Sequence, residues 1–234
     1  EKQIAKIKVN LESISGIEVK ATLKRYVLHE ETLAHILGYV GDISSDEIKR
    51  DKLLAEIQNT QIGKTGIEKE FDHILRGKPG IQTQERDVKG KLVRILDTQG
   101  AKDGKDIYLT IDQKLQDHLF KLFKNRRGAL VALEPKTGFV RALISSPSFN
   151  PNILNSIVDN DEVESLFSNR ESPIFNRAIS GQYPPASTLK PFVGLAAIEN
   201  AVISWDKKIK DDGKFYVEGD PRPYRGWKEN GHGR

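Results

Sequence analysis

The stretch "NRAISGQYPPASTLKPF", residues 176–192, decides how the rest of the chain is interpreted. It places a serine (Ser187) and a lysine (Lys190) three residues apart, just after Pro184 and Pro185. Residues at this spacing are neighbours on a helix surface, with Cβ atoms about 5–6 Å apart. The stretch therefore has two possible meanings: a capped helix N-terminus with a solvated lysine, or a nucleophile with its base.

A serine nucleophile needs a base, and a lysine can serve as one only where its surroundings lower its pKa from ~10.4 by about 3 units. The N-terminus of a helix carries about half a positive charge, which disfavours an ammonium group, and burial acts in the same direction. The sequence 184–203 is almost entirely apolar after its first turn. It predicts a long helix, buried against a sheet, that would supply this desolvation.

Composition limits the possible functions. The chain has 234 residues, of which 37% are apolar and 30% charged, as in a globular protein. Its formal charge of +4 comes without a basic run interleaved with aromatic residues, which argues against nucleic-acid binding. It has no cysteine, so thiol catalysis and zinc–thiolate sites are excluded within this stretch. No apolar run approaches ~18 residues, and because methionine is also absent we expect an excerpt of a longer protein.

Residues 1–105 predict short mixed elements with polar turns. Residues 16–23 alternate as a half-buried strand, and Ser44 with Glu47 has the spacing of a capping box. Residues 86–96 predict a hairpin about Lys89 and Gly90. Two helical stripes are expected, one through Leu33, Ile36, Leu37 and Val40, and one through Ile67, Phe71, Ile74 and Leu75 with Gly77 at its end.

The pattern strengthens after residues 98–106, a polar, glycine-bearing segment that we interpret as the linker between two parts. A strand is expected at 107–111, followed by a helix capped by Asp112. Two apolar runs then flank a four-residue turn, Pro135 to Gly138, and predict a hairpin. The helix capped by Asp112 should bury the stripe formed by Leu115, Leu119, Leu122 and Phe123.

Several segments together resemble a known family. Residues 176–192 are similar to the nucleophile region of class B penicillin-binding proteins, and S-x-x-K is a motif of the penicillin-binding proteins. Residues 63–80 resemble the N-terminal pedestal of that family, and residues 105–116 the start of its catalytic domain. Residues 129–152 resemble the first hairpin of that domain. Residues 16–41 and 224–233 point more narrowly to members that act in rod-shape elongation.

The resemblance implies an α+β fold in two parts. An elongated N-terminal pedestal (dimerisation-type) domain would occupy residues 1–104, and the first part of a penicillin-binding, serine β-lactamase-like transpeptidase domain would occupy residues 105–234. Ser187 would be the acylated nucleophile, and Lys190 the base that takes its proton. The Ser187 backbone N–H would form half of an oxyanion hole. The resemblance implies no cofactor.

The same resemblance implies a substrate and partners. The reaction would be D,D-transpeptidation of peptidoglycan stem peptides ending in D-Ala-D-Ala, and β-lactams would acylate the same serine. A SEDS-type glycosyltransferase and other elongation proteins would contact the pedestal. The parent protein would be anchored in the inner membrane and face the periplasm. No nucleic acid is implied.

The family needs two further motifs after S-x-x-K, namely S-x-N and K-[ST]-G. Here "KTG" occurs at 64–66 and 136–138 and "SFN" at 148–150, all before Ser187. The second "KTG" has the composition of a plain turn. Because neither motif follows Ser187, we expect the 234-residue chain to be almost unreactive towards penicillin.

Two alternative functions and one possible metal site compete with this interpretation. The chain could be a non-catalytic pedestal or interaction module, or a β-lactam sensor or serine β-lactamase; the segment at 63–80 argues against the sensor and the lactamase. Some relatives carry a zinc site of two aspartates, a histidine and a cysteine. Asp211 and His232 match two of these ligands, but Gly226 stands where the second aspartate would fall. We therefore expect no metal.

Overall fold

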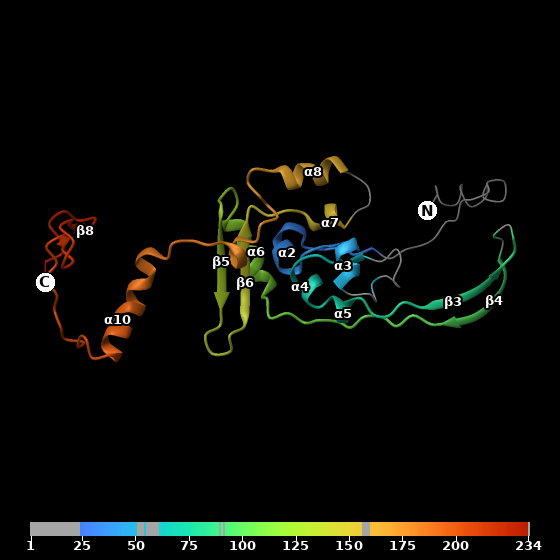
Figure 1. The fold of residues 1–234 in the computed structure, drawn as a ribbon, viewed down its shortest axis with the longest axis horizontal. Helices are drawn as coiled ribbons and strands as arrows, with labels where there is room; N and C mark the ends of the chain where they lie inside the picture. The colour runs from blue at the N-terminus through green and yellow to red at the C-terminus, as the bar shows by residue number, and fades with distance from the viewer. Residues whose placement is uncertain are drawn as a thin grey trace. The chain divides into compact units, whose positions relative to one another are not determined.

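The computed structural model describes residues 24–50, 54, 61–88, 90, 92–155 and 160–233. The chain forms two compact units, Glu1–Gly181 and Gln182–Arg234, both containing helices and strands (Figure 1). The expected α+β class is confirmed. The described strands form four separate two-stranded antiparallel sheets, and none of these sheets runs through both units. The strand expected at 16–23 lies outside the described residues.

The first helix among the described residues, α2 (Glu30–Leu37), ends three residues before Val40, the last residue of its predicted apolar stripe. Gly38 adopts a left-handed conformation with φ +80°, which ends the helix at little steric cost for glycine. Val40 was expected on the helical stripe and instead begins strand β1 (Val40–Asp42), so that prediction is wrong. Strand β1 pairs with β2 (Gln61–Gly63).

The capping box predicted before helix α3 (Ser45–Arg50) is confirmed. The Ser44 N–H donates to Glu47 Oε2 at 2.7 Å, and the Glu47 N–H donates to Ser44 Oγ at 3.3 Å. Two backbone donors that a helix N-terminus leaves free are thereby satisfied.

The helix expected from residue 65 to its end at Gly77 is interrupted. It forms two short helices, α4 (Gly66–Glu70) and α5 (Asp72–Leu75). At Phe71 the backbone leaves the α region, with φ −109° and ψ 20°, and this residue both ends the first helix and begins the second. Gly77 follows in a left-handed conformation (φ +70°), at the end that the sequence predicts.

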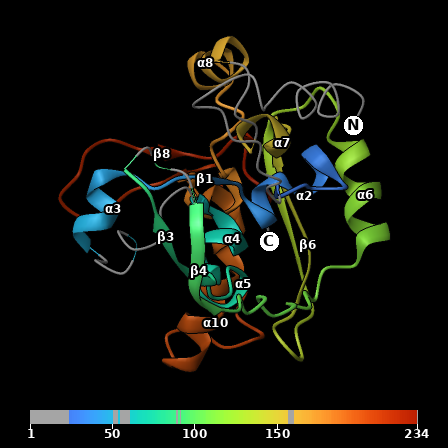
Figure 2. The same ribbon diagram turned by 90° about the vertical axis from the view of Figure 1, so that its right-hand side faces the viewer.

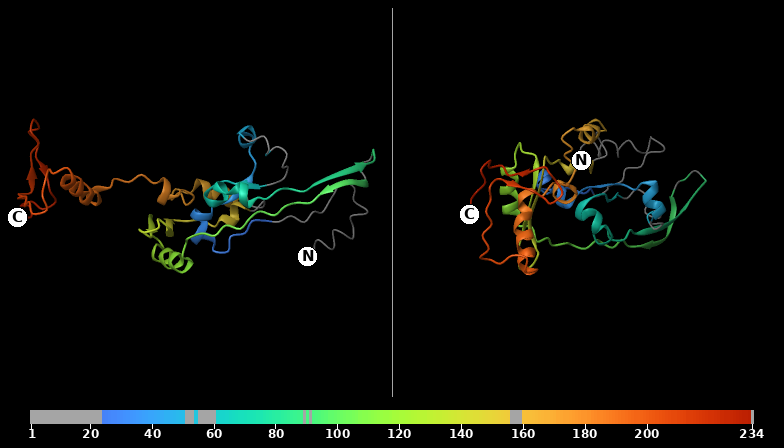
Figure 3. Two further views of the ribbon diagram at one scale, coloured as in Figure 1. Left: turned by 90° about the horizontal axis from the view of Figure 1, so that it is seen from below. Right: turned by 60° about the vertical axis from the view of Figure 1, so that its left-hand side comes forward.

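The hairpin predicted at 86–96 is confirmed and is longer than expected. Strands β3 (Ile81–Arg86) and β4 (Leu92–Gln99) run side by side in register from Ile81 opposite Gln99, with two register shifts (Figure 3). Gly90 lies in the turn at φ +80°, and Lys89 is outside the described residues. Every residue of β4 is exposed.

Residues 98–106 do not form the free linker that their composition suggests. Lys78 and Lys102 exchange two backbone hydrogen bonds of 2.8 and 2.9 Å. A Cβ on Gly104 would lie 1.9 Å from the carbonyl oxygen of Leu75, so only glycine fits there. The segment packs against the end of α5. A division into domains at 104/105 stays a prediction.

Residues 107–111 are extended but pair in no sheet, so the strand expected there is wrong. At the end of this segment the Asp112 N–H donates to the Arg141 carbonyl at 2.8 Å. Asp112 also caps helix α6 (Gln113–Leu122), because its carboxylate accepts the Leu115 N–H at 3.1 Å. The predicted cap is confirmed.

The second hairpin is also confirmed. Strands β5 (Gly128–Leu133) and β6 (Val140–Ser146) are joined by the predicted turn at 135–138. Strand β6 is the more deeply buried of the two, with Ala142 and Ile144 at 0% and 1% exposure, and both α2 and α6 contact it (Figure 2). The other buried apolar residues described are Val27, Ala34, Val40, Leu54, Ile62 and Phe149.

Three short helices complete the first unit: α7 (Pro151–Leu154), α8 (Asn160–Ser168) and α9 (Arg177–Ser180). Helices α7 and α9 are each capped by an asparagine, Asn150 and Asn176 respectively. Helix α9 contacts both strands of the β5–β6 hairpin.

The second unit contains the 3₁₀ turn η3 (Ala186–Leu189), helix α10 (Lys190–Glu199) and two short strands, β7 (Lys214–Phe215) and β8 (Tyr224–Arg225). The buried helix expected at 184–203 is shorter, and none of its residues is buried. The strands described in this unit are two residues long, and they offer little surface on which a ten-residue apolar helix could pack.

In the part of the chain that the structure describes, no helix combines the length and the apolar character needed to cross a membrane.

Candidate active site

Ser187 lies in the first turn of the helical segment, as expected. The turn η3 begins at Ala186, and α10 continues it from Lys190. Ala186 has φ +46°, a left-handed conformation that alanine rarely adopts. Backbone strain of this kind is characteristic of functional sites and costs of the order of 1–3 kcal/mol. The residue before the candidate nucleophile is thus held in an unusual conformation.

The helical geometry brings Ser187 and Lys190 to one side. In a 3₁₀ turn, side chains at i and i+3 eclipse one another, so these two lie on the same face. Both residues are exposed, and no hydrogen bond between them is found among the described residues. Pro191 is tolerated because it falls in the first turn of α10. The pair therefore has the spacing of a nucleophile and base without a formed contact.

Two hydrogen bonds from Thr188 stabilise the turn η3. Both the Thr188 N–H (3.1 Å) and the Thr188 hydroxyl donate to the Pro185 carbonyl. Because Pro184 and Pro185 have a fixed φ, the chain that leads into Ser187 has few conformations.

Ahead of this turn, the chain is fastened to strand β6 through Arg177, which is 3% exposed. The Arg177 N–H donates to Ser145 Oγ at 2.9 Å, and Ser145 Oγ donates to the Phe175 carbonyl at 3.2 Å. The Arg177 guanidinium donates to the carbonyls of Glu171, Ser172 (3.0 Å) and Phe175 (3.3 Å). A buried charge that donates to several carbonyls fixes the loop before α9.

Sequence reasoning missed a set of buried amide side chains in the first unit. Gln116, fully buried, donates to the carbonyls of Thr32 and Leu143 and accepts the Leu143 N–H, all at 2.8–2.9 Å. Asn152 exchanges two hydrogen bonds with the Val27 backbone, at 2.8 and 2.9 Å. These amides satisfy backbone groups of Val27, just before α2, and of Thr32, within α2.

A third amide, Asn155, accepts the Val40 N–H at 3.0 Å and is 1% exposed. For the amides near residue 150, the sequence contains one signal: Asn150 followed by Pro151 predicts the start of a helix. Nothing in the pattern of α6 distinguishes Gln116 as its buried position. The predicted stripe of that helix is less covered, with Leu115 at 36% and Leu122 at 57% exposure.

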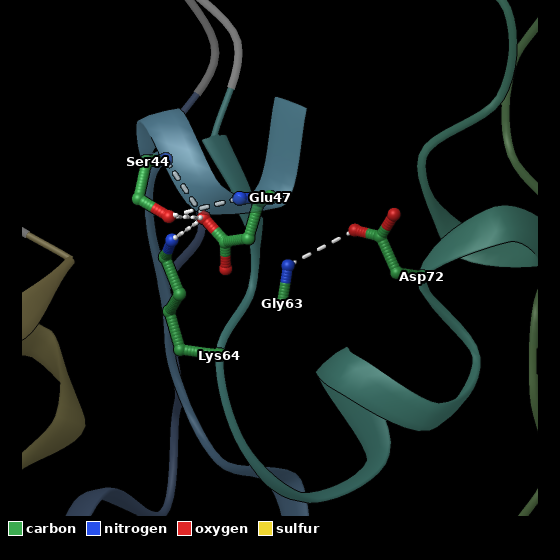
Figure 4. Close-up of polar contacts among 5 residues, drawn as sticks. All are labelled: Ser44, Glu47, Gly63, Lys64 and Asp72. Carbon is green, nitrogen blue, oxygen red and sulfur yellow. Dashed lines mark hydrogen bonds and ion pairs between the residues drawn. The ribbon is translucent and has the colours of Figure 1, made fainter. Parts of the chain in front are cut away.

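The first "KTG", at 64–66, has a structural role (Figure 4). Lys64 Nζ lies 2.6 Å from Glu47 Oε2, the oxygen that also accepts from Ser44. The Lys64 ammonium, and then the Ser44 N–H, lower the pKa of Glu47 to about 2. Asp72 holds the adjacent strand by accepting the Gly63 N–H at 3.0 Å. These residues fix β2 to the capped end of α3.

We expect Glu47→Gln to destabilise the first unit by about 1 kcal/mol, since it weakens a capping box and removes a partly exposed ion pair. Urea unfolding of the variant at pH 7 measures this. Because the folded pKa of Glu47 is lowered, its contribution is present above pH 4.5 and is lost as the pH falls towards 2. Lys49→Met, which removes a largely exposed partner of Asp46, is the matched control; an equal loss in both variants would contradict the expectation.

The second "KTG" and the "SFN" sequence also have structural roles. Lys136, Thr137 and Gly138 form the β5–β6 turn, where Gly138 has φ +74° and Thr137 Oγ1 accepts the Phe139 N–H at 3.2 Å. In "SFN", the Ser148 hydroxyl donates to the Glu31 carbonyl at 2.7 Å.

His35 is the one buried histidine among the described residues, at 8% exposure. Its ring packs edge-to-face on Phe149, with centroids 5.4 Å apart, and its Nε2 has no hydrogen-bond partner. Burial, and then the charge of Arg177, lower the pKa of His35 to about 4. The ring borders a largely apolar cavity of about 770 Å³ in the first unit, which Thr65 and Ile179 also line.

Asp211 and His232 do come together. His232 Nδ1 lies 2.7 Å from Asp211 Oδ2, and the same oxygen accepts the His232 N–H at 3.1 Å. The contact to His232, and then the Gly213 N–H, lower the pKa of Asp211. The pair joins the ends of a loop, since Asp211 and Gly233 also exchange two backbone hydrogen bonds. Among the described residues no group of three or more histidine, aspartate or glutamate side chains could hold a metal ion.

Comparison with known proteins identifies two family domains in the chain. Residues 1–109 match the Penicillin-binding Protein dimerisation domain, and residues 128–234 match the Penicillin binding protein transpeptidase domain. The chain belongs to the penicillin-binding proteins in which these two domains follow one another.

Among curated relatives, it is similar to Peptidoglycan D,D-transpeptidase MrdA of Acinetobacter baumannii, with 38% identity over all of this chain and 35% of the relative. It is 37% identical to the Escherichia coli K12 protein of that name, over all of this chain and 38% of the relative. The chain thus spans somewhat more than a third of the length of each.

The chain is also similar to solved structures of PBP2 proteins. PBP2 from Helicobacter pylori, in complex with MreC, matches 99% of this chain and 43% of its own with a TM-score of 0.85 and 29% identity. Pseudomonas aeruginosa PBP2, in complex with WCK 5153, matches 92% of this chain and 44% of its own with a TM-score of 0.77 and 32% identity. The expected family is therefore confirmed.

Proposed function

We propose that the protein is a peptidoglycan D,D-transpeptidase in which Ser187 attacks the stem peptide and Lys190 accepts its proton. The observation that carries this proposal is the position of the pair, one in a 3₁₀ turn and the other at its end, three residues apart on one face. A helix N-terminus favours negative charge, so it would stabilise the oxyanion that forms beside Ser187.

The chemistry follows from this placement. The Ser187 hydroxyl would attack the carbonyl between the two D-alanines and lose its proton to Lys190. The bond to the last D-Ala would break, and this residue would leave with the proton. An amine of a neighbouring stem peptide would then attack the acyl-enzyme and release Ser187. β-Lactams would acylate the same oxygen, and the reaction as written uses no cofactor.

The partners and the location are inferred from the family resemblance. The protein would work with elongation proteins, since H. pylori PBP2 forms a complex with MreC. A SEDS-type glycosyltransferase would be a second partner. We place the protein at the periplasmic side of the inner membrane, with the pedestal at residues 1–104 and the transpeptidase part at 105–234.

A second candidate function is that of an interaction module of the elongation machinery. One observation favours it: the β3–β4 hairpin exposes apolar side chains, and no other strand among the described residues pairs with either of its outer edges. Such an edge suits pairing with another chain. The exposed apolar residues of the two strands are Ile81, Leu92, Val93, Ile95 and Leu96.

The deciding experiment maps a penicillin adduct. A protein extended to the length of the curated relatives is treated with labelled penicillin, digested, and analysed by mass spectrometry. We expect the adduct on Ser187. The 234-residue chain should remain almost unlabelled, because it has no S-x-N or K-[ST]-G motif after Ser187 and so lacks an oxyanion donor and the strand that docks the substrate. An adduct on another residue of the longer protein would overturn the assignment.

A further inference from the structure

We infer that Thr188 is a positioning residue for Ser187, because its hydroxyl helps to close the turn η3 around a backbone conformation that Ala186 does not favour. The Thr188 hydroxyl and the Thr188 N–H, the latter at 3.1 Å, both donate to the Pro185 carbonyl. The two residues that these bonds enclose are Ala186 and Ser187. Such a role rests on the proposed function of Ser187 and adds a residue that does not itself touch the reacting atoms.

The unfavourable conformation is that of Ala186. Among residues 184–190, all of which the structure describes, only Ala186 has a positive φ, at +46°. The φ values of Pro185, Leu189 and Lys190 are −68°, −79° and −57°, as in a right-handed helix. A left-handed conformation brings the Cβ of an alanine close to the following carbonyl oxygen, so it persists only where the surrounding structure imposes it. The hydrogen bonds that close the turn supply this constraint.

The Thr188 side chain strengthens the closure in a way that the backbone alone does not. A single bond from an N–H to the carbonyl three residues earlier has poorer geometry than the bond of an α-helix. The hydroxyl adds a second bond to the same acceptor, and the branched Cβ of threonine restricts the rotation of that hydroxyl. The acceptor is itself fixed, since the ring of Pro185 locks its φ.

The closed turn determines how Ser187 is presented. The bonds from Thr188 form only while Ala186 and Ser187 keep their φ and ψ, and the φ and ψ of Ser187 direct its N–H and its Cβ relative to α10. The Ser187 carbonyl in turn accepts the Lys190 N–H, so the turn continues directly into that helix. Relaxation of Ala186 to a negative φ would open the turn and release Ser187, and small misplacements of a reacting group slow a reaction strongly.

The test compares Thr188→Val with Thr188→Ser in a protein extended to the length of the curated relatives. Valine keeps the branched shape of threonine without the hydroxyl, whereas serine keeps the hydroxyl. Thr137→Val is the matched control, because Thr137 Oγ1 accepts the Phe139 N–H at 3.2 Å in the β5–β6 turn of the first unit. It also removes a bond between a threonine hydroxyl and the backbone of a turn.

A second pair of proteins tests whether the hydroxyl acts through Ala186. Thr188→Val is made again in the Ala186→Gly background, and each Thr188→Val protein is compared with its own Thr188 parent. Glycine adopts a left-handed conformation without the steric cost that alanine meets. The turn should therefore depend less on the hydroxyl in this background.

Stopped-flow acylation by a fluorescent penicillin separates the binding constant, the acylation rate constant and the fraction of reactive protein. We expect Thr188→Val to lower the acylation rate constant about tenfold when residue 186 is alanine and about twofold in the Ala186→Gly background. The binding constant and the reactive fraction should not change. Thr188→Ser and Thr137→Val should both stay within about twofold of the wild-type rate.

Several results would overturn the inference. An equal fold loss in the two backgrounds would mean that the hydroxyl does not act through Ala186, and a reduced reactive fraction with a normal rate constant would mean a role in folding alone. A normal rate in Thr188→Val, with the wild-type adduct on Ser187, would overturn the inference and leave the proposed function standing. If the wild-type protein forms no adduct at Ser187, the proposed function fails, and the role of Thr188 fails with it.

Discussion

Lys190→Arg is expected to slow acylation of Ser187 by about 10²–10⁴-fold in a protein extended to the length of the curated relatives, the range typical for the loss of a general base. An arginine keeps the positive charge and the length of the side chain but does not release its proton in proteins, so it cannot accept the proton of the serine. Lys190→Ala should cause a loss of similar size. Acylation by a fluorescent penicillin, followed over time at pH 7.5, measures both.

This pair of variants separates the two meanings of the S-x-x-K sequence. If Lys190 is only a solvent-exposed lysine at a helix end, Lys190→Arg should leave the acylation rate unchanged and Lys190→Ala should lower it only slightly. Lys208→Arg, at an exposed lysine of the same unit, is the control and should react at the wild-type rate. A Lys190→Arg variant that acylates at the normal rate would remove Lys190 from the proposed mechanism while leaving Ser187 in place.

Acid should weaken the first unit through His35. The folded pKa of this histidine is about 4, below its ordinary value of 6.5, so the unfolded chain binds a proton more readily. Stability from the neutral ring is therefore complete above pH 6.5 and is lost as the pH falls towards 4. Between pH 7 and 4.5 this loss is about 2.5 kcal/mol.

Urea unfolding at the two pH values measures the effect. His35→Phe keeps an aromatic ring against Phe149 but cannot take up a proton, so its stability should fall about 2.5 kcal/mol less than that of wild type over the same interval. His73→Asn, at an exposed histidine, should retain the wild-type dependence on pH. An NMR titration that places the His35 midpoint near 6.5 would contradict the expectation.

The elements that the sequence predicts well are those set by local chemistry. The Asp112 cap, the Ser44–Glu47 capping box and both hairpins depend on residues close to one another in the chain. The start of the helical turn at Ser187 is of the same kind, since Pro184 and Pro185 precede it. Such signals need no knowledge of the tertiary structure.

The errors arise where distant residues determine the outcome. The segment 107–111 has the alternation of a strand but lies along β6 without joining a sheet. Residues 98–106 are polar like a linker, yet Gly104 packs on the backbone of α5. Gln116 shows the limit clearly, because its burial depends on carbonyls 27 and 84 residues away in the sequence. The roles of Ser187 and Lys190 rest on the family motif and stay predictions.

The buried amides at Gln116, Asn152 and Asn155 have a consequence for engineered chimeras. They pair with the backbone of residues 25–40, which lies in the half of the chain that matches the dimerisation domain, whereas Gln116 lies between the two matched halves and Asn152 and Asn155 lie in the other half. A graft that exchanged residues 1–104 between relatives would separate each backbone segment from the amides that pair with it. The interchangeable module is therefore larger than either sequence domain, and successful recombination should carry residues 1–181 as one piece.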